Sequence, residues 1–246
     1  MPIGNLQMAT RAGLTLIALH LLLLQPAAAD ETRYLAATAV DLTALLPGPP
    51  AAGSAPAQQD MDAVLRAQAA RTPEAVAAAR ADAEVSVFRF ADVLGPSFTG
   101  DRLPMTAALF KAVGKDATKI GRQAKDHWHR PRPYRANDLV KPLVDVSTDG
   151  SYPSGHAMFG CMTAVLLGVM VPEQRAALLE RGQAYGYKRV VAGVHYPTDV
   201  EAGCASGRIV AAVLLQAPAF QADFTAARNE TRRALGLAAD PPRPPN

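Results

Sequence analysis

The stretch Gly150-Ser151-Tyr152-Pro153-Ser154-Gly155-His156, followed directly by the apolar run 157–171, decides the fold of this chain. Pro153 disfavours helix in the residue before it, Ser154 is a good N-cap, and the apolar run has helical length. We therefore predict a helix that begins near Gly155. The run is too short to span a bilayer, so this helix is expected to be the buried central helix of the domain.

The start of this helix is a candidate anion site. Its first backbone N–H groups are unpaired and carry the positive end of the helix dipole, and Gly155 allows a ligand to approach the backbone closely. His156 stands in the first turn, where it can reach the same ligand. An isolated Ser-Gly-His is more often an ordinary capped helix with a surface histidine, so the rest of the chain must decide.

The composition is typical of a globular helical protein. Of the 246 residues 49% are hydrophobic and 19% charged, which excludes disorder of the whole chain. Only 6% are aromatic, and no long alternation of apolar and polar residues indicates a sandwich or barrel. We predict an all-α fold, a single compact helical domain. The 25 basic and 22 acidic residues form no stripe, which argues against a nucleic-acid partner.

Residues 1–29 have the pattern of a secretory signal peptide. Arg11 supplies the positive start, 12–24 the apolar core, and the three alanines 27–29 the cleavage site, so the mature chain is expected to begin at Asp30. The alternative is a retained membrane anchor, which the short apolar core and the small residues disfavour. We expect a periplasmic or secreted protein, with no stable membrane insertion after cleavage.

Proline, glycine and capping residues divide the remaining chain. Residues 30–57 are predicted to form an extended N-terminal arm, 58–236 the helical domain, and 237–246 a proline-rich disordered tail. The expected helices are 59–70, Thr72 to about 94, Pro104 to the basic cluster 125–135, 155–171, 172–189, one capped by Thr198 that reaches about 216, and 219–235.

Histidines and cysteines outside the opening stretch carry weaker signals. His127 and His129 lack further ligands at metal-binding spacing, so we expect no metal site and no cofactor. Cys161 and Cys204 are the only cysteines. Export allows a disulfide between them, but two buried free thiols explain the same spacing, and both interpretations stay open.

Three separated pieces together indicate phosphoryl transfer. They supply three cations, an anion-binding helix start, and two histidines, one of them beside a carboxylate that can fix its tautomer. Such a set neutralises the charge on the oxygens of a transferring phosphoryl group. The pieces are Lys125 with Arg132-Pro133, then Pro153-Ser154-Gly155-His156, then Arg189 with His195 and Asp199.

These residues closely resemble the signature of the type 2 phosphatidic acid phosphatase and vanadium haloperoxidase superfamily. Within it the chain is similar to the bacterial class A non-specific acid phosphatases. The likeness extends beyond the three pieces to Leu45-Leu46-Pro47, Ala124-Lys125-Asp126-His127 and Asp199-Val200-Glu201-Ala202-Gly203. It departs from that class at Lys188, Ala157 and Tyr196-Pro197, which puts the substrate preference in doubt rather than the reaction.

The resemblance implies a role for each site residue. His195 is the nucleophile that forms a phosphohistidine, Asp199 orients it, and a charged His156 is the general acid. Metal is not required. The implied substrates are small phosphate monoesters of broad variety, and family members form homo-oligomers. The implied phosphate-binding residues are Lys125, Arg132, Ser154, Gly155 and Arg189.

Three other functions fit the sequence less well. A vanadium-dependent haloperoxidase uses a similar oxyanion pocket but is generally a much longer chain. A membrane lipid phosphatase needs spanning helices, which we do not find after residue 29. A non-catalytic phosphate-binding protein needs the cations but not both histidines.

Overall fold

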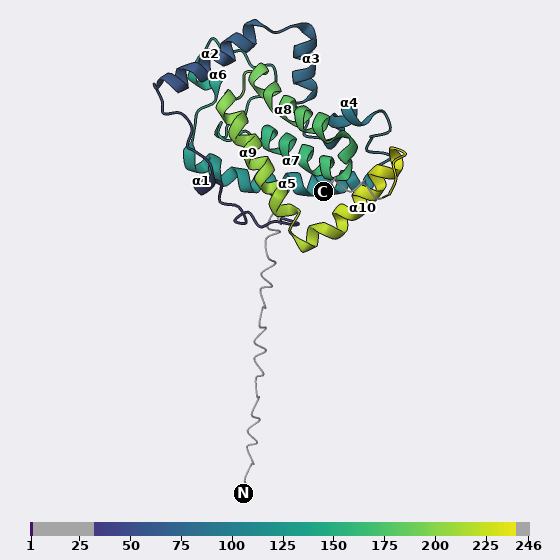
Figure 1. Ribbon diagram of the computed structural model, residues 1–246. Coiled ribbons are helices and arrows are strands. Elements are labelled where there is room, and N and C mark those ends of the chain that lie inside the picture. The colour runs from purple at the N-terminus through teal and green to yellow at the C-terminus, as the bar shows by residue number, and fades with distance from the viewer. Residues whose placement is uncertain (2–31, 240–246) are drawn as a thin grey trace. The chain divides into compact units, whose positions relative to one another are not determined.

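The computed structural model describes Met1 and residues 32–239 (Figure 1). Residues 2–29 of the expected signal peptide and residues 240–246 of the expected tail lie outside the described residues. Every regular element of the described part is helical, which confirms the all-α prediction. The elements are α1 (Leu42–Leu45), α2 (Ala55–Ala69), α3 (Pro73–Ala81), η1 (Val87–Phe90), α4 (Ala91–Leu94), α5 (Pro104–Trp128), α6 (Pro133–Ala136), α7 (Gly155–Met170), η2 (Pro172–Gln174), α8 (Arg175–Val191), α9 (Pro197–Leu214) and α10 (Pro218–Ala234).

Helix α7 is the central element, as predicted. It packs mainly against α8 and α9 and also contacts α5 and α10, which surround it in Figure 1. Nearly all of its side chains from Ala157 to Met170 are buried. Among the described residues no single helix is long and apolar enough to cross a membrane, although α9 and α10 pass that test as a pair bent by 98°.

Glycines allow α7 to approach its neighbours at backbone distance. A Cβ added at Gly207 of α9 would lie 2.3 Å from the Met158 carbonyl oxygen, and one at Gly203 would lie 2.4 Å from the Ser154 carbonyl oxygen. A Cβ added at Gly182 of α8 would lie 2.6 Å from the Ala164 Cβ. The close packing therefore fixes the N-terminus of α7 next to the first turns of α9.

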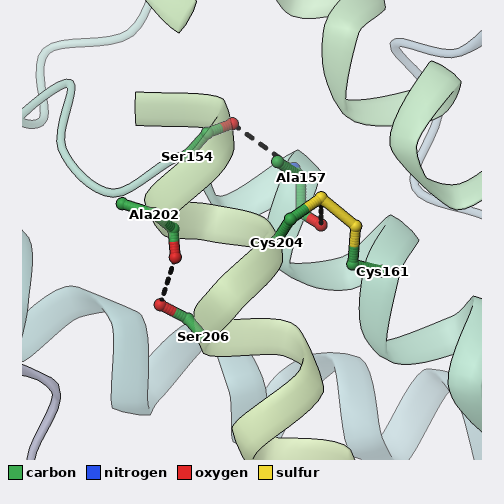
Figure 2. The surroundings of a disulfide bond; sticks show 6 residues. All are labelled: Ser154, Ala157, Cys161, Ala202, Cys204 and Ser206. Carbon is green, nitrogen blue, oxygen red and sulfur yellow. Dashed lines mark hydrogen bonds between the residues drawn. A yellow bond between two sulfur atoms is a disulfide. The ribbon is translucent and has the colours of Figure 1, made fainter. Parts of the chain in front are cut away.

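A disulfide also joins α7 to α9, near the N-terminal end of each helix. Figure 2 shows Cys161 and Cys204 bonded, with their Cα atoms 5.0 Å apart. Beside the bridge, the Ala157 carbonyl lies 3.8 Å from the Cys204 sulfur, and the Ser206 hydroxyl donates to the Ala202 carbonyl at 2.7 Å. Of the two interpretations left open by the sequence, the structure has the disulfide.

The prediction of one long helix from Thr72 to about residue 94 is wrong. Helix α3 ends at Ala81, because the buried Asp82 carboxylate binds Arg89 at 3.0 Å and Arg181 of α8 at 2.8 Å. Ser86 then starts the 3-10 turn η1 by accepting the Phe88 N–H. The buried ion pairs thus interrupt a segment whose helix propensity alone predicted continuity.

The N-terminal arm is more structured than predicted. Asp41 caps the short helix α1, and Ser54 starts α2 at Ala55, four residues before its expected beginning. The arm is held by Asp116 of α5, a fully buried carboxylate. Its oxygens accept the backbone N–H groups of Arg33, Tyr34 and Leu35 at 2.9, 2.8 and 3.1 Å.

The glycine contacts generate a stability prediction. Gly207→Ala is expected to lower the free energy of unfolding by about 1–3 kcal/mol, because the new methyl group meets backbone atoms that cannot move aside. Gly114→Ala in α5 is the control, since its Cβ would meet the Phe159 ring at an ordinary 3.4 Å. Urea unfolding measures both variants. An equally stable Gly207→Ala protein would contradict the proposed constraint.

Candidate active site

The end of α8 and the start of α9 bring His195 and Asp199 together. Asp199 lies in the first turn of α9, where its Oδ2 accepts the Tyr196 backbone N–H at 2.9 Å. The same oxygen lies 3.2 Å from His195 Nδ1, as predicted from the sequence. The prediction that Thr198 caps this helix is wrong. Helix α9 begins at Pro197, its N-cap residue is Tyr196, and the Asp199 carboxylate accepts the backbone N–H of Tyr196.

The hydrogen bonds fix the tautomer of His195. Arg132 Nη1 lies 3.0 Å from His195 Nε2, and a guanidinium only donates, so Nε2 must carry the lone pair. The ring proton is then on Nδ1 and is donated to Asp199. Complete burial, with the charges of Arg132 and Lys125, holds the pKa of His195 well below its ordinary value. The ring is therefore neutral at neutral pH.

Three cations converge on His195 from three elements. Lys125 comes from the last turn of α5, Arg132 is the N-cap of α6, and Arg189 comes from the last turn of α8. Burial lowers the pKa of Lys125 to about 8 and that of Arg189 to about 10, so both remain charged in acid. Arg189 Nε and Nη1 are buried and have no hydrogen-bond partner within the described residues.

A cavity of about 990 Å³ joins these side chains to the start of α7. Gly155 leaves open space where a Cβ would sit, so its backbone is accessible as predicted. Ser154 is fully buried and does not line the cavity, and its hydroxyl caps α7 by accepting the Ala157 N–H at 3.3 Å. The lining residues include Lys125, Arg132, Gly155, His156, Arg189 and His195.

His156 faces the cavity from the first turn of α7. Its Nε2 donates to the Ala83 carbonyl at 2.9 Å, a group that the break after α3 leaves available. Burial and the charge of Arg189 lower the pKa of His156 to about 4. In this structure His156 is therefore neutral at pH 7, whereas the sequence led us to expect a charged imidazolium.

A buried ion-pair network, absent from the sequence prediction, supports Asp199. Arg130 Nη1 binds Asp199 at 2.6 Å, its Nη2 binds Asp60 of α2 at 2.7 Å, and its guanidinium lies 4.0 Å from the centre of the Tyr196 ring. Burial raises the pKa of Asp199, and Arg130 opposes that shift. The only signal in the sequence for the Arg130–Asp199 ion pair is that Arg130 lies two residues before Arg132.

Asp149 is a second residue that the sequence analysis missed. Its carboxylate lines the same cavity and binds two of the three cations, Arg132 at 2.7 Å and Lys125 at 3.5 Å. Partial burial opposes ionisation, but the charges of Lys125 and Arg132 and the Ser147 hydroxyl outweigh it and hold the pKa of Asp149 below its ordinary value. The cavity therefore contains a fixed anion among its cations.

Known acid phosphatases are similar to this chain in sequence. A non-specific acid phosphatase of Providencia stuartii is 32% identical over 203 residues, 78% of this chain and 81% of that protein. An acid phosphatase of Zymomonas mobilis subsp. mobilis is 38% identical over 148 residues, 57% of this chain and 54% of that protein. Residues 105–222 match the PAP2 superfamily model. The chain belongs to the PAP2 superfamily.

A solved structure extends the likeness to the fold. A bacterial vanadium-dependent iodoperoxidase superimposes with a TM-score of 0.50 at 16% identity, covering 72% of this chain and 53% of that one. At this identity the match concerns the fold alone. It agrees with the all-α architecture that the sequence predicted.

The Arg130 network generates a second prediction. Arg130→Met is expected to lower the free energy of unfolding at pH 7 by about 3–5 kcal/mol, because it leaves buried carboxylates without a cation. Loss of Arg130 raises the folded-state pKa of Asp199 further. A raised carboxyl pKa destabilises above the unfolded-state value, so the deficit should shrink as the pH falls towards 4.

Urea unfolding at pH 7 and pH 4.5 measures this effect. Arg33→Met is the control, because the Arg33–Asp223 ion pair is largely exposed and should contribute little. Equal deficits at the two pH values would show that the loss comes from packing rather than from the unpaired carboxylates.

Proposed function

We propose that this chain is an acid phosphatase that hydrolyses phosphate monoesters through a phosphohistidine intermediate and needs no metal. The observation that carries the proposal is the position of His195 Nε2, whose lone pair accepts Arg132 Nη1 at 3.0 Å in a cavity that Lys125 and Arg189 also line, while Asp199 holds the other ring nitrogen. A lone pair held among cations suits attack on an anionic phosphoryl group.

In the first step the hydrogen bond from Arg132 Nη1 to His195 Nε2 opens, and the freed Nε2 lone pair attacks phosphorus. The N–P bond forms as the P–O bond to the alcohol breaks, and the departing alkoxide takes a proton from His156. The positive charge that develops on the His195 ring is stabilised by Asp199 through the Nδ1 proton. The three cations and the amides of Gly155 and His156 neutralise the phosphoryl oxygens; Ser154 contributes by capping α7.

In the second step water replaces His195. Neutral His156 takes a proton from the water as its oxygen attacks phosphorus, and the N–P bond electrons return to His195 Nε2. Inorganic phosphate leaves, and both rings regain their starting states. The acid of the first step thus becomes the base of the second, as microscopic reversibility requires.

The low pKa of His156 fits this cycle if the substrate dianion enters the cavity. Burial lowers the pKa of His156, and the cations lower it further because each of them repels the imidazolium. The two negative charges of a bound dianion attract the imidazolium and offset most of that repulsion, so they raise the pKa of His156. His156 then becomes an acid when substrate is present and stays neutral in the free enzyme.

Substrate range, location and assembly are also proposals. The name of the Providencia stuartii relative supports broad specificity towards phosphate monoesters. The pattern of residues 1–29 supports export to the periplasm or medium with cleavage after Ala29. Assembly into homo-oligomers rests on the family resemblance alone. We assign the catalytic chemistry to the helical domain, residues 58–236.

The two histidines provide the decisive test. His195→Ala is expected to abolish both turnover and labelling of the protein by phosphate, because no N–P bond can form. His156→Ala should lose most activity towards an alkyl phosphate and retain more towards p-nitrophenyl phosphate, whose phenolate leaves without a proton. It should still become labelled.

Assays run in EDTA also test the metal independence. Labelled protein is quenched without acid, since phosphohistidine is acid-labile. His127→Ala is the matched control, because this exposed histidine follows Lys125 closely on α5 but does not line the cavity. A labelled His195→Ala protein, or equal losses on both substrates for His156→Ala, would refute the assignment.

The pKa of His156 also predicts a pH dependence. Between pH 7 and pH 8 the substrate is a dianion throughout, whereas the protonated fraction of a group with a pKa of about 4 falls tenfold. We therefore expect kcat/KM towards an alkyl phosphate to fall about tenfold between pH 7 and pH 8. His156→Ala with p-nitrophenyl phosphate should show only the smaller fall that deprotonation of Lys125, whose pKa is about 8, causes in this range. An activity that rises with pH in the wild type would contradict the role of His156.

A further inference from the structure

Asp149 has no part in the reaction described above, although it contacts two of the residues proposed to bind phosphate. Its Oδ1 lies 2.7 Å from Arg132 Nη2, and its Oδ2 lies 3.5 Å from Lys125 Nζ. The side chain is 47% exposed and lines the cavity. A carboxylate oxygen and a phosphoryl oxygen compete for the same N–H donors.

Two of the three cations already donate to protein acceptors. Arg132 donates Nη1 to the Val194 carbonyl and to His195, and donates Nε to the backbone carbonyl of Asp149 at 3.2 Å. Lys125 Nζ donates to the Gly150 carbonyl at 2.5 Å. A phosphoryl group that bridges Arg132 Nη2 and Lys125 Nζ therefore competes with the Asp149 carboxylate, which bridges the same two nitrogens.

We infer that Asp149 is an internal competitor anion, which holds Lys125 and Arg132 between turnovers and is displaced by the phosphoryl group. This inference rests on the proposed function. It makes Asp149 a determinant of affinity: the carboxylate weakens binding of substrate and of product, and it assists release of phosphate by returning to the cations. Without it, three buried cations would retain a dianionic product.

The side chain can move while its backbone stays in place. The preceding residues are anchored by Tyr134, whose hydroxyl donates to the Ser147 carbonyl at 2.6 Å and accepts the Ser147 N–H at 3.0 Å. Ser147 also donates its hydroxyl to Asp149 Oδ1. Rotation of the half-exposed carboxylate towards solvent therefore requires no rearrangement of a helix.

The charge balance supports the same conclusion. Lys125, Arg132 and Arg189 carry three positive charges, of which the Asp149 carboxylate offsets one while phosphate is absent. Asp199 is left out of this balance, because it pairs with Arg130 at 2.6 Å and neither of these two side chains lines the cavity. A phosphate dianion that displaces Asp149 offsets two of the three charges and can therefore outcompete the single charge of the carboxylate.

The test measures binding of inorganic phosphate by calorimetry at pH 7, which requires no turnover. Asp149→Asn is expected to bind phosphate about tenfold more tightly, because the competing charge is removed at close range. In kinetic assays it should lower KM without raising kcat. Asp149→Ala is a second neutral variant that should behave in the same way if the asparagine variant folds poorly.

Asp145→Asn is the matched control. Asp145 lines the same cavity and is exposed, but it has no hydrogen bond or ion pair within the described residues. The control should change phosphate affinity less than twofold. Equal gains for Asp145→Asn and Asp149→Asn would overturn the inference, because bulk charge would then explain the effect.

Unchanged or weaker binding by both Asp149 variants would also overturn it, since Asp149 would then position the cations rather than compete. Failure of the wild type to bind phosphate would refute the proposed function and this inference with it. Phosphate binding by the wild type without a gain in the Asp149 variants refutes the inference alone.

Discussion

The site depends on the close contact between the N-terminal ends of α7 and α9. Glycines of α9 allow the two backbones to approach, and the Ser154 N–H donates to the Asp199 backbone carbonyl at 2.9 Å where the helices meet. One helix start presents Gly155 and His156, and the other presents Asp199 with His195 just before it. The start of α7 lines the cavity and adds its positive end to the three cationic side chains, whereas the first N–H groups of α9 donate to the carboxylates of Asp199 and Asp60.

Burial strengthens the electrostatic interactions in this site, but it also costs free energy because the charged groups lose their hydration. Removal from water lowers the pKa values of Lys125, Arg189 and both histidines, and repulsion by neighbouring cations lowers them further. The protein limits the cost by placing carboxylates at two points. Asp199, neutralised by Arg130, lies behind the nucleophile, and Asp149 lies among the cations. Asp199 orients the His195 ring, whereas Asp149 is the carboxylate that we infer a phosphoryl group displaces.

Much of this was predictable from the sequence. The central helix, its start at Gly155, and the meeting of Lys125, Arg132, Arg189, His156, His195 and Asp199 followed from capping residues, proline positions and the family resemblance. The ion pairs were not predictable, because Asp60, Arg130 and Asp149 are distant in sequence or unremarkable in type. The break after α3 was missed for the same reason: Asp82 meets Arg181 only once α8 has packed. Long-range charge pairing leaves no local pattern.

The way Asp116 holds the N-terminal arm has a consequence for divergence of the sequence. Asp116 binds the amides of residues 33–35 rather than their side chains. Every amino acid except proline carries such an amide, so the attachment itself imposes almost no sequence requirement on the arm. Sequence requirements in this segment therefore come from the side chains instead: Arg33 and Tyr34 both bind Asp223, and Leu35 is buried, whereas the backbone attachment to α5 would survive their substitution.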